Sequence, residues 1–334
     1  MALSLTAPIV YDDIQEIVLL KPLKVFLLRG YAGDEIVIKA DAVQAGHVKS
    51  AGVVVKAIDP GVKMKVLTPP EILELRNYVE LYLAVMDVMG AVIVTDPERA
   101  AIDSLRQLFA MPGNVTMMKM NKQTLQDLGE AFNMRSQGDK GPVKQFITAL
   151  KSPGGLEKLG QVIAADMYNG NTDRFCPLEP GVPPMPPLSA GSLSVQLKVV
   201  VNPGNVMIIV GPTGAFSASL LDYVDPQSQF KDSTHTLANQ EAGQVWPGRT
   251  LIDKTARHAF AKDVIEDLEK ILHPKKHKLS LKTKLGSDAV KRLEAGMLEA
   301  VKLIKRALEV KYNPAKWNSV PSVRDRYQLL CQIK

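Results

Sequence analysis

The chain has 334 residues, of which 46% are hydrophobic and 23% charged, and its formal net charge is +6. This composition is that of a globular protein with an ample core, and the length predicts two domains or one two-lobed unit with an extension. The two cysteines argue against a disulfide-rich scaffold, and the five histidines show no zinc-binding spacing. An aromatic content of 5%, with no recognition motif, speaks against nucleic acid as a partner.

The sequence shows no targeting or membrane-spanning segment. Residues 1–10 lack a positive leader followed by a long apolar core. The longest apolar run, 81–94, is interrupted by Asp87 and is too short to cross a bilayer. We therefore expect a protein that works in the cytoplasm.

The first predicted element, within residues 25–41, is a strand, a glycine-containing turn and a second strand. Gly30 and Gly33 lie in the turn, and Lys39 lies among apolar residues of the second strand. In a kinase N-lobe such glycines let backbone amides approach phosphate, and such a lysine neutralises the α- and β-phosphates of ATP. Because the full glycine-rich signature is absent, an ordinary hairpin with an exposed lysine is the alternative.

A helix is predicted to begin at Pro69-Pro70-Glu71, since proline and an acidic residue both favour the first turn. The apolar residues of 72–89 recur at helical spacing. We expect Gly90 to end this helix and residues 91–94 to form a strand.

Glu80 lies within the apolar stretch of this helix, where an unpaired carboxylate would be costly to bury. Lys39 is the partner that we expect for it. Two alternatives remain: Glu71 or Glu74 serves this role instead, or Glu80 faces solvent.

Residues 115–120 predict a strand leading into a helix that starts within 121–128, with Asn121 or Thr124 as its N-cap. Kinases bind adenine against backbone groups at such a strand-to-helix crossing. Met118 and Met120 are therefore candidates for adenine binding, although methionines also serve as flexible core filler.

Three polar clusters follow, each beside an apolar run: Asp173-Arg174, then Asn202-Pro203-Gly204-Asn205, then Asp222. Phosphoryl transfer to a hydroxyl needs a carboxylate to orient the nucleophile, and an amide oxygen with a second carboxylate to hold magnesium. Three surface turns are the simpler interpretation, because asparagine, aspartate, glycine and proline are common turn residues.

The series Lys39, Glu80, Asp173-Arg174, Asn205 and Asp222 resembles the atypical kinases of the actin-fragmin kinase and phosphatidylinositol 3/4-kinase-like group. The segment 159–175 looks especially like the helix that enters their catalytic loop. The resemblance implies an α+β, two-lobed kinase-like fold with a β-rich N-lobe and a helical C-lobe, and ATP and Mg²⁺ as cofactors. It also implies that Asp173 orients the substrate hydroxyl, that Arg174 steadies the loop or the transition-state charge, and that Asn205 and Asp222 bind magnesium.

The chain also departs from this group. There the catalytic aspartate and the metal-binding asparagine share one short loop, whereas residues 176–201 separate them here. A proline-rich run within this insert is expected to project from the surface. Asn202 competes with Asn205 for the metal, and we prefer Asn205 because it abuts the next strand. No glycine follows Asp222, and Asp225 is the alternative ligand.

Two amphipathic helices are predicted near the C-terminus, at 255–272 and 288–308. The positive charge of the chain is concentrated between them, in residues 273–284. Such a segment can attract an acidic protein surface or anionic lipid, or it is simply a solvated loop.

We thus expect a kinase-like N-lobe with the hinge at 1–120, a C-lobe with the catalytic and metal-binding loops at 121–250, and a helical, basic extension at 251–334. The expected function is transfer of the ATP γ-phosphate to a Ser/Thr hydroxyl of a protein substrate, and the resemblance suggests an effector acting in a host cytosol. The alternatives are a phosphoinositide-type lipid kinase, an AMP transferase on the same fold, and a pseudokinase that acts as a binding module.

Overall fold

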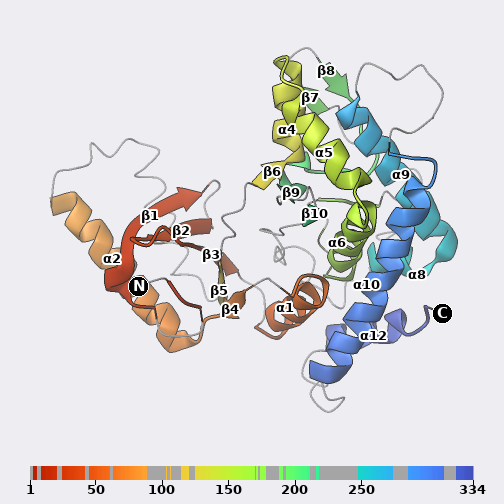
Figure 1. The fold of residues 1–334 in the computed structure, drawn as a ribbon. Coiled ribbons are helices and arrows are strands. Elements are labelled where there is room, and N and C mark those ends of the chain that lie inside the picture. Colours follow the sequence, from red (N-terminus) through yellow and green to blue (C-terminus); the bar gives the residue numbers. More distant parts are fainter. Residues whose placement is uncertain are drawn as a thin grey trace. The chain divides into compact units, whose positions relative to one another are not determined.

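The computed structural model is a mixed α+β protein whose chain divides into two compact units (Figure 1). The first unit comprises residues 1–49 and 61–122, and the second comprises residues 50–60 and 123–334. The structure describes residues 3–5, 9–20, 25–41, 45–60, 63–88, 103, 106, 114–119, 125–169, 171, 174–177, 188–190, 193–210, 216–217, 247–273, 285–311 and 321–333.

The first unit is built on a five-stranded antiparallel sheet with the strand order β1-β2-β3-β5-β4. Its strands are β1 (Ile14–Leu20), β2 (Val25–Gly30), β3 (Glu35–Asp41), β4 (Met64–Val66) and β5 (Asn114–Lys119). A 3₁₀ turn, η1 (Tyr11–Asp13), precedes β1, and the helix α2 (Pro69–Val88) follows β4. The predicted strand–turn–strand unit and the predicted helix at 69–89 are thus confirmed, apart from Met89 and Gly90, which lie outside the described residues.

The core of the first unit lies between the sheet and α2. Phe26 and Leu28 of β2 and Ile36 and Ile38 of β3 alternate along their strands, so they share one face, and all four are fully buried. They form one apolar cluster with Leu75, Val79 and Leu83 of α2 and with Val115 and Met117 of β5. The period of two in the strands and of about 3.6 in the helix therefore produces this layer.

The second unit is mainly helical and contains a small antiparallel sheet of order β10-β9-β6. Its helices are α4 (Leu128–Ser136), α5 (Gly141–Lys151), α6 (Gly155–Asn169), α8 (Pro247–Ile252), α9 (Lys254–Leu272), α10 (Ala289–Lys311) and α12 (Pro321–Leu330). Its strands are β6 (Leu125–Asp127), β9 (Met207–Val210) and β10 (Phe216–Ser217), with a separate hairpin of β7 (Leu188–Ala190) and β8 (Leu193–Val195). A further helix, α1 (Ala45–Ile58), begins among residues of the first unit, and its residues 50–58 belong to the second.

Helix α6 is the centre of the second unit, and α10 packs closely along it (Figure 1). A Cβ on Gly160 of α6 would lie 2.1 Å from the backbone oxygen of Leu293, and one on Gly296 of α10 would lie 1.9 Å from that of Glu157. Both glycines are therefore required for the two backbones to approach so closely. Arg292 closes the same crossing with two hydrogen bonds to Glu157, Nε–Oε1 at 2.8 Å and Nη2–Oε2 at 2.9 Å.

The helices predicted at 255–272 and 288–308 are confirmed as α9 and α10, and the strand expected next to Asn205 is confirmed as β9. The helix predicted to start within 121–128 does so only at the last of these residues, and the N-caps predicted for it were wrong. Residues 125–127 form β6, which pairs with β9, and the following helix begins only at Leu128. Its N-cap is Asp127, whose carboxylate accepts a hydrogen bond from the Glu130 backbone N–H at 2.5 Å, and not Asn121 or Thr124.

Candidate active site at the end of helix α6

A buried ion pair connects the last turn of α6 to the segment that follows it. Asp166 and Arg174 are 1% and 2% exposed. The guanidinium binds the carboxylate in a fork, with Nε donating to Oδ2 at 2.7 Å and Nη2 donating to Oδ1. Two parallel charge-assisted hydrogen bonds fix direction as well as distance, and a buried charge is tolerated only with such a partner. Arg174 is therefore held in a single orientation.

Asn171 is bound to the same aspartate. Its side-chain Nδ2 donates to Asp166 Oδ1 at 3.2 Å, and its backbone N–H donates to the Asp166 carbonyl at 2.8 Å. Asp173, the predicted catalytic aspartate, lies outside the described residues. Its neighbours Asn171 and Arg174 are both anchored, so the chain is fixed on either side of position 173.

The residues after Arg174 pair with a distant part of the chain. Phe175 and Val200 form an antiparallel β-bridge, in which the Cys176 N–H donates to the Val199 carbonyl at 2.9 Å and the Val201 N–H donates to the Arg174 carbonyl at 3.0 Å. The two ends of the insert at 176–201 are therefore paired with each other. Position 202 comes directly beside the 171–176 segment in space, although it is remote in sequence.

The turn after this bridge carries the two candidate metal-binding asparagines. Asn202 precedes the short 3₁₀ helix η2 (Pro203–Asn205), and its side-chain Oδ1 accepts a hydrogen bond from the Gly204 N–H at 3.1 Å. The Asn205 N–H donates to the Asn202 carbonyl at 3.1 Å, and β9 begins two residues later. The side-chain oxygen of Asn202 is thus used to close the turn.

A cation caps the C-terminal end of α6. Arg326 of α12 is 3% exposed, and its Nη1 donates to the carbonyls of Tyr168 at 3.0 Å and Asn169 at 3.1 Å. The end of a helix carries partial negative charge, so a guanidinium is favourable there. Burial lowers the pKa of Arg326 to about 10, which leaves it charged at neutral pH. The helix end from which the 171–176 segment departs is fixed by this contact.

The predicted phosphate-binding glycines form a hairpin turn between β2 and β3. Gly33 adopts a φ of 73°, the left-handed region that suits glycine. Its N–H donates to the Gly30 carbonyl at 2.7 Å, and the Gly30 N–H donates to the Asp34 carbonyl at 2.8 Å. The carboxylate of Asp34, which is 7% exposed, accepts a hydrogen bond from the Leu3 N–H. Both glycine amides therefore have partners inside the hairpin, as in an ordinary three-residue turn.

Lys39 and Glu80 are not brought together. Ile38 faces the core with α2, so Lys39, the next residue of β3, lies on the opposite face of the sheet. Its backbone pairs with Val25 and Thr116. Glu80 lies on α2 with its carboxylate 3.5 Å from Arg106, and the two side chains are 41% and 49% exposed. The geometry thus supports the alternative in which Glu80 faces solvent.

The remaining candidates lie in β5 or outside the described residues. Met118 is in β5, where it pairs with Val37 and Met64. The undescribed candidates are Met120, Asp173, Asp222, Asp225 and residues 274–284 of the basic segment. Within the described part of the chain, no three His, Cys, Asp or Glu side chains gather closely enough to hold a metal ion.

The sequence did not predict a role for three buried charged residues of the second unit: Asp166, Arg326 and Asp267, the last in α9. Asp166 carried a usable signal, because it stands in the apolar helical run Val162–Tyr168 where a carboxylate needs a partner. Arg326 and Asp267 lie in segments rich in charge, where no pattern separates a buried charge from an exposed one.

Cys176 and Cys331 form no disulfide bond. Among the described residues, no helix combines the length and the apolar character that a membrane crossing requires. No protein-family model matches the chain, and comparison with curated proteins and with solved structures found no match.

Proposed function

We propose that this protein is an atypical kinase that transfers the γ-phosphate of ATP to a Ser/Thr hydroxyl of a protein substrate. The observation that carries the proposal is the β-bridge between Phe175 and Val200. It supports the proposal despite the insert, because the Val201 N–H donates to the carbonyl of Arg174, the residue that follows Asp173 in the sequence, and Asn202 comes directly after Val201. The assignment of the two units to kinase lobes is part of this proposal.

In this proposal Asp173 orients the substrate hydroxyl and accepts its proton. Arg174 holds the loop and does not contact phosphate, since its guanidinium is buried and bound to Asp166. Of the two roles that the resemblance implies for Arg174, the geometry thus favours the steadying of the loop.

The donors available for magnesium are the amide oxygen of Asn205 and the carboxylate of Asp222, with Asp225 as the alternative. These are hard oxygen ligands, the type that Mg²⁺ prefers, and the end of the Asn202–Asn205 turn lies directly before β9. When bound, magnesium neutralises charge on the phosphates of ATP. Asn205 would hold the magnesium ion from the turn that Asn202 closes. This turn comes shortly after Val200, the residue bridged to Phe175.

We assign contact with the α- and β-phosphates to Lys39, whose backbone lies in the middle of a paired strand. Glu80 receives no role, because it lies toward Arg106 and on the far side of the sheet from Lys39. The hairpin of Gly30 and Gly33 would contribute to the shape of the phosphate site. It would not donate the N–H groups of these glycines to phosphate, since both have partners within the hairpin. Adenine would contact backbone groups near Met118 and Met120.

The direct test supplies the purified protein with Mg²⁺ and ATP labelled at either the γ- or the α-phosphate, together with a cell lysate. Transfer of γ-label but not α-label to protein supports the proposal. Transfer of α-label indicates an AMP transferase, and γ-label on phosphoinositide vesicles alone indicates a lipid kinase. If neither label is transferred while nucleotide still binds, the enzyme assignment is wrong and the chain is a binding module.

For the place of action we propose the cytoplasm, either of the producing cell or of a host. The basic segment 273–284 would draw the protein to an acidic protein surface or to anionic lipid. Such attraction weakens with salt, so any partner held by Lys275, Lys276 and Lys278 should dissociate as ionic strength rises. Charge reversal of these three lysines should abolish binding without changing phosphate transfer to a soluble peptide.

A further inference from the structure

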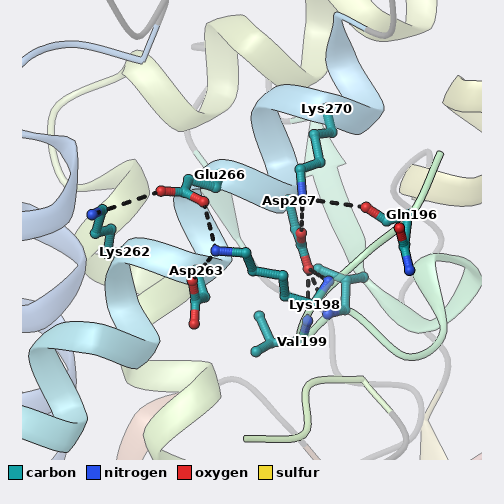
Figure 2. A network of polar contacts seen from close by, with 9 residues as sticks. Gln196, Lys198, Val199, Lys262, Asp263, Glu266, Asp267 and Lys270 are labelled. Atoms are coloured by element: carbon teal, nitrogen blue, oxygen red, sulfur yellow. Dashed lines mark hydrogen bonds and ion pairs between the residues drawn. The ribbon is translucent and has the colours of Figure 1, made fainter. Parts of the chain in front are cut away.

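One buried carboxylate binds three consecutive backbone amides. Asp267 of α9 is fully buried, and its Oδ2 accepts hydrogen bonds from the N–H groups of Lys198 at 2.7 Å, Val199 at 2.7 Å and Val200 at 3.1 Å (Figure 2). A carboxylate that accepts several N–H bonds is stabilised in its charged form. A single side chain thus fixes the direction of this piece of backbone.

The neighbouring side chains extend the attachment along α9. Lys270 donates to Asp267 Oδ1 at 3.2 Å and to the Gln196 carbonyl at 3.2 Å. Lys198 points to the other side, where Asp263 at 2.8 Å and Glu266 at 2.9 Å hold it and raise its pKa (Figure 2). The Lys198 side chain is 43% exposed, and exposed ion pairs contribute little. Asp267 is therefore the principal anchor of the strand.

The anchored residues, 198–200, include the bridge partner of the segment that follows Asp173 in the sequence. The Val199 carbonyl accepts from Cys176 and the Val201 N–H donates to Arg174, while Lys198, Val199 and Val200 donate toward α9. A single bridge between two short segments is not stable by itself. Asp267 supplies the additional hydrogen bonds that residues 198–200 need. Asn202 comes directly after Val201, the last residue that bonds to the other segment.

We infer that Asp267 is a positioning residue for phosphoryl transfer: it fixes the strand that aligns the loop of Asp173 with the turn of Asn202 and Asn205. This inference rests on the proposed function for its catalytic part. Its structural part is that removal of the Asp267 carboxylate loosens the bridge of Val200 with Phe175, although Asp267 takes part in neither of the two hydrogen bonds that close this bridge.

The test compares Asp267→Asn and Asp267→Ala with Asp253→Ala. Asp253 is the N-cap of the same helix, near its other end, and its carboxylate accepts from the Ala256 N–H at 2.7 Å. Asp253→Ala therefore weakens α9 by another route, while Asp267→Asn keeps an acceptor and loses the charge.

Backbone hydrogen exchange of the full chain, without nucleotide, reads the structural part. The amides to follow are those of Cys176 and Val201, the two cross-strand donors. We expect both to exchange roughly tenfold faster or more in Asp267→Ala, because three buried donors lose their acceptor, and to change less in Asp267→Asn. Asp253→Ala should leave them near the wild-type rate. Unchanged exchange at Cys176 and Val201 in both Asp267 variants would overturn the inference, whatever the activity.

Steady-state kinetics read the catalytic part. Misplacement of the loop should lower kcat by about 10- to 100-fold in Asp267→Ala, with a smaller loss in Asp267→Asn and little change in KM for ATP. Equal kcat in wild type and both variants, in spite of faster exchange, would show that the anchoring does not serve the reaction and would refute the positioning role. A wild-type protein that transfers no phosphate would instead remove the proposed function and the catalytic part with it, leaving the exchange result to decide the structural part alone.

Discussion

Replacement of Asp166 by alanine should be among the most damaging single substitutions in the second unit. Arg174, 2% exposed, would keep its charge and lose both of its carboxylate bonds, and Asn171 would lose an acceptor. Breaking a buried pair by removing one partner costs about 3–5 kcal/mol. The conservative variant Asp166→Asn keeps the shape and should lose less.

Far-UV circular dichroism during urea unfolding measures this effect, because the second unit is mainly helical. With a slope of about 2 kcal/mol/M, a loss of this size lowers the urea midpoint by roughly 1.5–2.5 M. The double variant Asp166→Leu/Arg174→Met replaces both charges by apolar groups and should be more stable than Asp166→Ala alone, since no unpaired charge remains.

Two results would refute this reasoning. One is an Asp166→Ala protein whose midpoint corresponds to a loss below about 1 kcal/mol, well short of a broken buried pair. The other is additivity. If the double variant Asp166→Leu/Arg174→Met loses as much free energy of unfolding as the two single variants combined, the two side chains are not coupled, contrary to their contact.

Three further predictions concern other parts of the molecule. Gly296→Ala should lower the stability of the second unit by at least about 1–3 kcal/mol in the same assay, because its Cβ would lie 1.9 Å from the Glu157 oxygen; a wild-type midpoint would contradict the packing described. The pKa of Glu71, lowered to about 2 mainly by its hydrogen bond from Lys65, should rise toward the ordinary carboxyl value in Lys65→Met when followed by NMR; the stabilisation from this pair is complete above that ordinary value and is lost as pH falls through about 2. Lys39→Arg should impair ATP use despite its conserved charge, whereas unaltered ATP affinity and turnover in Lys39→Ala would remove Lys39 from the site.

The parts of the fold that the sequence predicted well are those in which one period of apolar residues persists over a whole element. The helix α10 places Leu293, Met297, Val301 and Leu308 on one buried stripe, and β3 is a short apolar run whose Ile36, Val37 and Ile38 are all buried. In such elements burial and local geometry favour the same structure. The hairpin of Gly30 and Gly33 was predictable for a similar reason, because only glycine suits the left-handed position.

The prediction failed where a long-range contact decided the structure. Residues 125–127 form a strand because Met207–Ile209 lie beside them, and nothing in the local sequence indicates that partner. The helix then starts one residue after Asp127, whose spacing to Glu130 is itself a capping signal that the sequence interpretation overlooked. The helix α1 was not predicted at all.

In the candidate site, too, local patterns could be predicted from the sequence and long-range contacts could not. Asp173 and Asn205 could be selected from the sequence by residue type and order, whereas the bridge of Phe175 with Val200, which joins the two ends of the insert between them, could not. Asp267 acts on backbone N–H groups, which every residue except proline carries, so no side-chain pattern in residues 198–200 reveals it. The pairing of Lys39 with Glu80 was inferred from two plausible elements, and the alternation of side chains along β3 separates the two residues.

The measurement that tests the central claim most directly is the turnover of Asp173→Ala on an identified protein substrate. As the residue that orients the hydroxyl and accepts its proton, Asp173 acts chiefly in the transition state, so its loss should lower kcat by roughly 10²- to 10⁴-fold. The affinity for ATP should remain close to the wild-type value, because the nucleotide is bound by other groups. Unchanged phosphate transfer in Asp173→Ala would contradict the mechanism proposed for this protein.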